Sequence, residues 1–74
     1  MSQITYTDIE ATLKGFSIEI TASAPDEREK TISVPCEDIK ELFGMNHVKW
    51  FNERGDDSES LWMLFNAVNG IHIN

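Results

Sequence analysis

The residues able to do chemistry are few, and their spacing does not suit a catalytic or metal site. The chain has one cysteine, Cys36, and two histidines, His47 and His72, which are well separated along the sequence. No pair among them and the carboxylates has the short spacing of metal ligands, and residues 56–59 lack the alternation and the downstream glutamate of a calcium loop. We therefore expect no bound metal and no cofactor.

A nucleophile would have to be Cys36. A helix N-terminus can activate a thiol, and Cys36 lies at the start of an expected helix, but no base is identifiable as its partner. A buried or capping cysteine is the simpler interpretation. The glycines are dispersed along the chain and form no phosphate-binding loop: they are Gly15, Gly44, Gly55 and Gly70. The sequence therefore predicts that the protein is not an enzyme.

The strongest global feature is negative charge. Thirteen Asp and Glu residues stand against six Lys and Arg residues, which gives −7 over 74 residues. Phosphate backbones repel such a chain, so we expect no direct binding to nucleic acid. The expected partner is instead a larger basic protein or ribonucleoprotein that itself binds nucleic acid. The alternative is that the charge only keeps a small domain soluble.

The sequence has no feature that indicates a membrane segment or an export signal. The longest apolar run, residues 61–65, is too short to cross a bilayer, and residues 1–6 lack the basic and apolar parts of a signal peptide. The single cysteine excludes an internal disulfide. We expect a cytoplasmic protein that is a monomer or a weak homodimer.

The length of the chain predicts one small domain spanning residues 1–74, which must position the cysteine, the histidines and the carboxylates. We expect the α+β class, with an antiparallel β-hairpin or sheet packed against two to four short helices. Thr7 and Glu10 fit a capping box, which predicts a helix over residues 8–14 that ends at Gly15.

Two alternating segments, residues 16–23 and 31–34, predict strands. A charged loop joins them, so we expect an antiparallel hairpin. The apolar face of its first strand would consist of Phe16, Ile18, Ile20 and Ala22.

The clearest helix spans residues 36–43 and ends at Gly44. Its apolar stripe is Ile39, Leu42 and Phe43.

Together with the next segment of the chain, this helix looks like a helix-turn-helix whose recognition helix is residues 46–54. Lys40 stands where such motifs usually have a small residue, and the cations of the second helix are only Lys49 and Arg54. A small helix-turn-helix regulator is therefore an alternative, and a plain helical corner is the simpler interpretation.

The last part of the sequence is compatible with two structures. Apolar residues at three-four spacing predict a helix over residues 58–69, with Gly70 as its cap. The alternative is a strand that turns at Asn69 and Gly70 into a final strand. The pattern also leaves open whether residues 46–53 are helix or strand.

Two sets of residues are suited to recognition. The first is three acidic patches, which we expect to bind the partner: Asp26, Glu27 and Glu29; Glu37, Asp38 and Glu41; Glu53, Asp56, Asp57 and Glu59. The second is the pair Trp50 and Trp62, because tryptophan is enriched among interface hot spots. Core filling is the alternative role for both tryptophans.

In size, charge and expected element order (short helix, hairpin, then helices), the chain resembles small acidic phage-encoded inhibitors of the anti-CRISPR and anti-restriction type. The resemblance implies an inhibitor that blocks a basic, nucleic-acid-handling partner, with carboxylates in the place of phosphates. An immunity protein or antitoxin that neutralises a nuclease would use the same physics and is an alternative.

Overall fold

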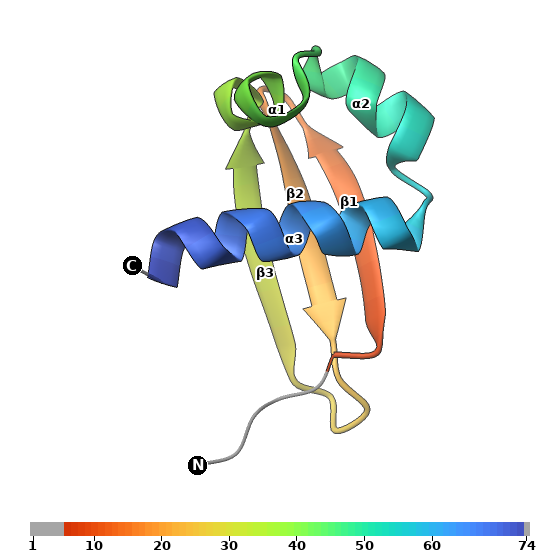
Figure 1. Cartoon of the computed structure of the whole chain (residues 1–74). Helices are drawn as coiled ribbons and strands as arrows, with labels where there is room; N and C mark the ends of the chain where they lie inside the picture. The colour runs from red at the N-terminus through yellow and green to blue at the C-terminus, as the bar shows by residue number, and fades with distance from the viewer. Residues whose placement is uncertain (1–5, 74) are drawn as a thin grey trace.

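The fold is a three-stranded sheet with one face covered by helix. The computed structural model describes residues 6–73, with side chains for residues 6–69. Over these residues the order is β1 (Asp8–Lys14), β2 (Ser17–Ser23), β3 (Glu29–Pro35), α1 (Cys36–Phe43), α2 (His47–Arg54) and α3 (Ser58–Ile73). The sheet is antiparallel in the order β1-β2-β3; α3 crosses one face, and α1 and α2 lie at one end (Figure 1). The predicted α+β class is confirmed.

Strand β1 replaces the helix predicted over residues 8–14, so that prediction was wrong. The side chains of the segment alternate strictly: Ile9, Ala11 and Leu13 are half-buried, and the residues between them are exposed. All seven residues pair with β2, from Asp8 opposite Ser23 to Lys14 opposite Ser17. A seven-residue helix has little stability of its own, whereas the strand gains a ladder of hydrogen bonds and an apolar face.

The turn between β1 and β2 contains two residues, Gly15 and Phe16. Gly15 has a φ of 52°, which fits the first central position of a type II′ hairpin turn. The turn places Phe16 at the tip of the hairpin, where 82% of its surface is exposed. The prediction that Phe16 faces the core was therefore wrong, because the strand begins one residue later, at Ser17.

The loop between β2 and β3, residues 24–28, contains one strained residue, Glu27. The amide of Glu27 donates to the carbonyl of Ala24 (3.1 Å), and the amide of Ala24 donates to the carbonyl of Arg28 (2.8 Å). Glu27 has a φ of 71°, the left-handed conformation that closes such loops and that glycine adopts without strain.

Replacing Glu27 by glycine is expected to raise the free energy of unfolding by about 0.5–1 kcal/mol, because relief of left-handed strain exceeds the added freedom of the unfolded chain. Urea denaturation measures the change. Asp26→Gly is the matched control and should not stabilise, because Asp26 does not have a positive φ and its carboxylate accepts from the amide of Arg28. Equal stabilisation by both glycines would contradict the strain argument.

The helices largely follow the sequence pattern. Helix α1 begins after Pro35 and ends at Gly44 in the left-handed conformation, as predicted, but Leu42 of its expected apolar stripe is 42% exposed. Of residues 46–53, which the sequence left open, residues 47–53 belong to α2, and Asn46 is the N-cap whose side chain accepts from the amides of Val48 and Lys49. Helix α3 continues past the predicted cap at Gly70, which excludes the alternative of a terminal hairpin.

The core lies between the sheet and the helices. Ile18, Ile20, Ala22 and Val34 of the sheet pack with Leu61, Leu64, Phe65 and Val68 of α3. Trp50 closes the end of this core: its side chain is 0% exposed, and its ring centroid lies 5.4 Å from that of Phe43. The expectation that Trp50 contacts a partner is therefore corrected, because a fully buried ring is not accessible in the folded protein.

Candidate protein-binding surface

The sheet face opposite α3 is lined by polar side chains and carries most of its charge as carboxylates. Because side chains alternate along a strand, the residues between the core positions all point to this face. Its carboxylates are Asp8, Glu10, Glu19 and Glu29, and its cation is Lys14. The β1 and β3 members of this set are exposed, and its one member on the central strand β2, Glu19, is half-buried. We call this surface the acidic sheet face.

Hydroxyl groups occupy most of the remaining positions of the acidic sheet face. They belong to Thr12, Ser17, Thr21, Ser23, Thr31 and Ser33. The Oγ1 atoms of Thr21 and Thr31 lie 2.9 Å apart across β2 and β3, which shows how closely the side chains of neighbouring strands approach. Carboxylates and hydroxyls on a regular sheet form a level surface rich in hydrogen-bond acceptors.

The first predicted acidic patch extends this face. Glu29 pairs with Ser23, which in turn pairs with Asp8, so these residues form one row across the sheet. Asp26 and Glu27 lie in the exposed loop just beyond that row. Arg28 partly offsets them, since its Nε lies 3.1 Å from Oδ2 of Asp26.

The other two predicted patches do not join it. Glu37, Asp38 and Glu41 belong to α1, which lies at the opposite end of the sheet from the β2–β3 loop (Figure 1). Glu53, Asp56, Asp57 and Glu59 lie around the junction of α2 and α3. All seven are exposed except Asp38, which is half-buried. The structure therefore separates the predicted binding residues into distinct surfaces.

Asp57 has a structural role as the cap of α3. Its Oδ2 accepts from the hydroxyl of Ser60 at 2.6 Å and from the amide of Ser60 at 3.3 Å. The hydroxyl of Ser60 is the main reason that the pKa of Asp57 lies below its usual value, and the backbone amides of Ser60 and Glu59 and the charge of Arg54 add to the effect. Asp57 is therefore already engaged and is a weak candidate for partner contact.

This cap predicts a pH effect. A carboxylate whose pKa is lower in the folded state contributes stability above its unfolded pKa and loses it as the pH falls through its folded pKa. In Asp57→Asn, which keeps a capping oxygen, the loss of stability on acidification below the ordinary aspartate pKa should be smaller than in the wild type. Thermal melts at stepped pH measure this; the loop neighbour Asp56→Asn is the control, and equal behaviour of the two variants would contradict the assignment.

Three carboxylates of the acidic sheet face, Asp8, Glu10 and Glu19, were missed by the reasoning from sequence. Glu19 could have been found, because the alternation of β2 places it on the face opposite to Ile18 and Ile20. Asp8 and Glu10 were assigned to a helix, and only the alternation of Ile9, Ala11 and Leu13 indicated otherwise.

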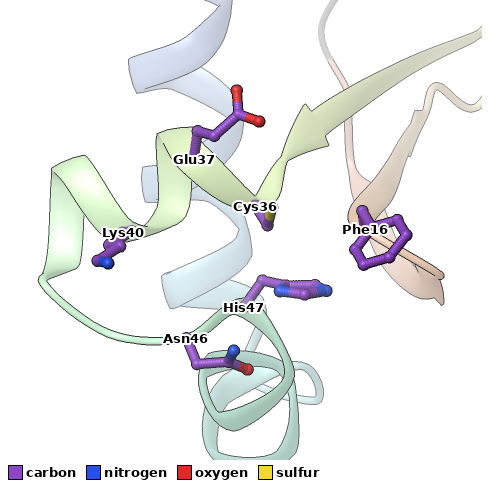
Figure 2. Close-up of a pocket in the computed structure, with 6 residues that line it drawn as sticks. All are labelled: Phe16, Cys36, Glu37, Lys40, Asn46 and His47. Carbon is purple, nitrogen blue, oxygen red and sulfur yellow. The ribbon is translucent and has the colours of Figure 1, made fainter.

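A groove of about 370 Å³ lies between the β1–β2 turn and the helical corner (Figure 2). It is lined by Phe16, Cys36, Glu37, Lys40, Asn46 and His47. In Figure 2 the His47 ring points toward the hairpin that carries Phe16, and the carboxylate of Glu37 points away from that ring. The groove brings together Cys36 and His47, which the sequence did not connect.

The geometry does not make Cys36 and His47 a nucleophile and its base. Nε2 of His47 lies 2.8 Å from the carbonyl oxygen of Gly15, and Nδ1 is buried without a hydrogen-bond partner among the described residues. Nε2 therefore donates to this carbonyl, and Nδ1 is shielded from solvent, so neither ring nitrogen is exposed to a substrate in the groove. His47 instead fixes the helical corner to the hairpin turn.

Trp62 keeps some of its surface accessible. It packs edge-on against Phe65, with ring centroids 5.9 Å apart, and is half-buried on α3. Unlike Trp50, it can contact a partner without unfolding of the core.

Comparisons with protein-family models, curated proteins and solved structures find no match to this chain. Within the described part of the chain, no three His, Cys, Asp or Glu side chains are grouped as metal ligands. Among the described helices, none combines the length and apolarity needed to cross a bilayer. The surface chemistry therefore provides the basis for a proposal about function.

Proposed function

We propose that the protein is a small binding protein that inhibits a larger, basic, nucleic-acid-handling partner through the acidic sheet face. The observation that supports it is the arrangement of four carboxylates and one lysine among the described strand residues on one face of the sheet. Residues two apart on a strand are about 7 Å apart and residues two strands apart are about 10 Å apart, so Asp8, Glu10 and Glu29 form a fixed array of negative charge. Such an array complements a site built to hold phosphates.

The rest of the molecule leaves this charge available. Two ion pairs, Arg28–Asp26 and Lys49–Glu53, are present among the described residues, and together they involve only two of the thirteen carboxylates. A sheet also needs little reorganisation on binding, because its side chains are positioned by paired strands. Occupation of the partner's nucleic-acid site would then exclude nucleic acid.

Two alternatives make different predictions. An immunity protein or antitoxin would protect against one nuclease and would use the same acidic surface. A helix-turn-helix regulator would bind duplex through α2, where Lys49 is already near Glu53 (4.0 Å) and the neighbouring exposed residues are Val48 and Asn52. Acidic and neutral side chains on that helix disfavour phosphate contacts.

The experiment is capture of the partner from a lysate, followed by competition with nucleic acid. The inhibitor proposal expects the protein to displace nucleic acid from the captured partner, with an affinity that falls as salt rises. It also expects no retardation of random duplex by the protein alone at low salt. Tight duplex binding, or a partner that holds nucleic acid and this protein together, would contradict it.

A further inference from the structure

The outer face of α3 differs in chemistry from the rest of the surface. All thirteen carboxylates and all six Lys and Arg residues lie within residues 8–59, so after Glu59 the helix has no Asp, Glu, Lys or Arg. Helices at a protein surface usually carry charged residues on the solvent side. In α3 the exposed side chains include Met63 and Asn66, and Trp62, which packs against the edge of the core, is half-buried beside them.

These residues have the composition of an interface. Met63 is 49% exposed, and Trp62 is half-buried beside it. Aromatic residues and methionine are enriched in the cores of protein interfaces, whereas Asp, Glu and Lys are depleted there. Figure 1 shows α3 lying across the sheet, with no other described element on its outer side.

The distribution of charge indicates what covers this face. Two copies of a chain that carries −7 repel each other when their acidic surfaces approach. Past Glu59, which is exposed one turn before Met63, α3 has no Asp, Glu, Lys or Arg, so two copies that meet along Trp62, Met63 and Asn66 bring fewer carboxylates together than two acidic sheet faces would. A basic partner, in contrast, is attracted to the carboxylates on the other surfaces.

We propose that two copies of this chain associate through the outer faces of α3. A twofold contact places Met63 and Trp62 of one copy against the same patch of the other. Asn66 lies on the same side, and its amide both donates and accepts hydrogen bonds, so it is able to pair with its symmetry mate. Because α3 and the acidic sheet face lie on opposite sides of the sheet, the dimer presents two acidic sheet faces outward, which allows bivalent binding.

Sedimentation velocity over a wide concentration range tests the contact. The wild type should show a reversible monomer–dimer equilibrium that strengthens with salt, because salt screens repulsion between the two acidic chains. Met63→Glu should raise the dimer dissociation constant at least about tenfold, because it buries an unpaired charge. Leu42→Glu is the matched control: it introduces the same charge at a similarly exposed residue of α1 and should leave the equilibrium nearly unchanged.

A change to a positive charge distinguishes two causes of dimer disruption: burial of a charge at the contact and greater repulsion between two acidic chains. Met63→Lys should also disrupt the dimer, since a desolvated cation is as unfavourable there as an anion. A dimer strengthened by Met63→Lys, a dimer equally disrupted by Leu42→Glu, or a monomer at every concentration would each overturn the assignment. Circular dichroism of each variant verifies the fold, and Asn66→Glu provides a second disruptive variant if Met63→Glu does not fold. The readout is self-association, so it does not depend on the partner that the acidic sheet face binds.

Discussion

Replacing Trp50 by alanine is expected to lower the free energy of unfolding by about 3–5 kcal/mol. Trp50 is fully buried and is the largest side chain in the core, where it contacts Phe43 and closes the end of the sheet–helix layer. A chain of 74 residues has a total stability of about 4–11 kcal/mol at typical values per residue. The variant should therefore be largely unfolded or strongly destabilised at about 37 °C.

Two further variants establish that the effect comes from the core. Trp62→Ala removes a half-buried ring and should cost clearly less than Trp50→Ala. Trp50→Phe should also cost less than Trp50→Ala, because the indole Nε1 has no hydrogen-bond partner among the described residues and phenylalanine removes that unsatisfied group. Urea denaturation gives the three values. A stable Trp50→Ala variant that no longer bound the partner would instead make Trp50 an interface residue.

Those elements whose local pattern has a single interpretation could be predicted from the sequence. Strands β2 and β3 alternate, and α1 has both a proline at its start and a glycine at its end. Such signals are contained in a few adjacent residues, so the α+β class could be deduced from them.

Strand β1 shows where this reasoning fails. Thr7 and Glu10 resemble a helix cap, while Ile9, Ala11 and Leu13 alternate as in a strand. The two local signals conflict, and pairing with β2 decides between them. That pairing depends on the two-residue turn at Gly15 and Phe16, where a glycine after a lysine is equally typical of a helix end. The same misassignment placed Phe16 in the core and changed the expected element order.

The candidate site could be predicted in chemistry but not in arrangement. The excess of carboxylates is a property of composition, but which carboxylates lie together depends on the pairing and register of the strands. Glu29 and Glu37 are separated in the sequence only by β3 and lie at opposite ends of the sheet, whereas Asp8 and Glu29 are far apart in the sequence and share one row. From the sequence, Asp57 is one more surface carboxylate, whereas in the structure its Oδ2 accepts from the amide and the hydroxyl of Ser60.

Reversing three charges on the acidic sheet face is expected to weaken partner binding by at least about 100-fold, because each lysine replaces an attraction by repulsion from a basic site. The variant is Asp8→Lys, Glu10→Lys and Glu29→Lys. All three residues are exposed and lie on one face of paired strands, so the fold should be retained. Association kinetics at several salt concentrations should show a slower association rate and a weaker salt dependence.

A second triple variant distinguishes the effect of where the charges are reversed from the effect of the change in net charge. Glu41→Lys, Glu53→Lys and Asp56→Lys make the same change, from −7 to −1, at exposed residues outside the acidic sheet face and without touching the cap at Asp57. This control slows association only through the overall field, so it should weaken binding far less. If the control were as damaging as the sheet variant, charge alone would drive association and no particular face would be selected. If it were more damaging, the binding surface would lie at the helical side of the molecule and not on the sheet.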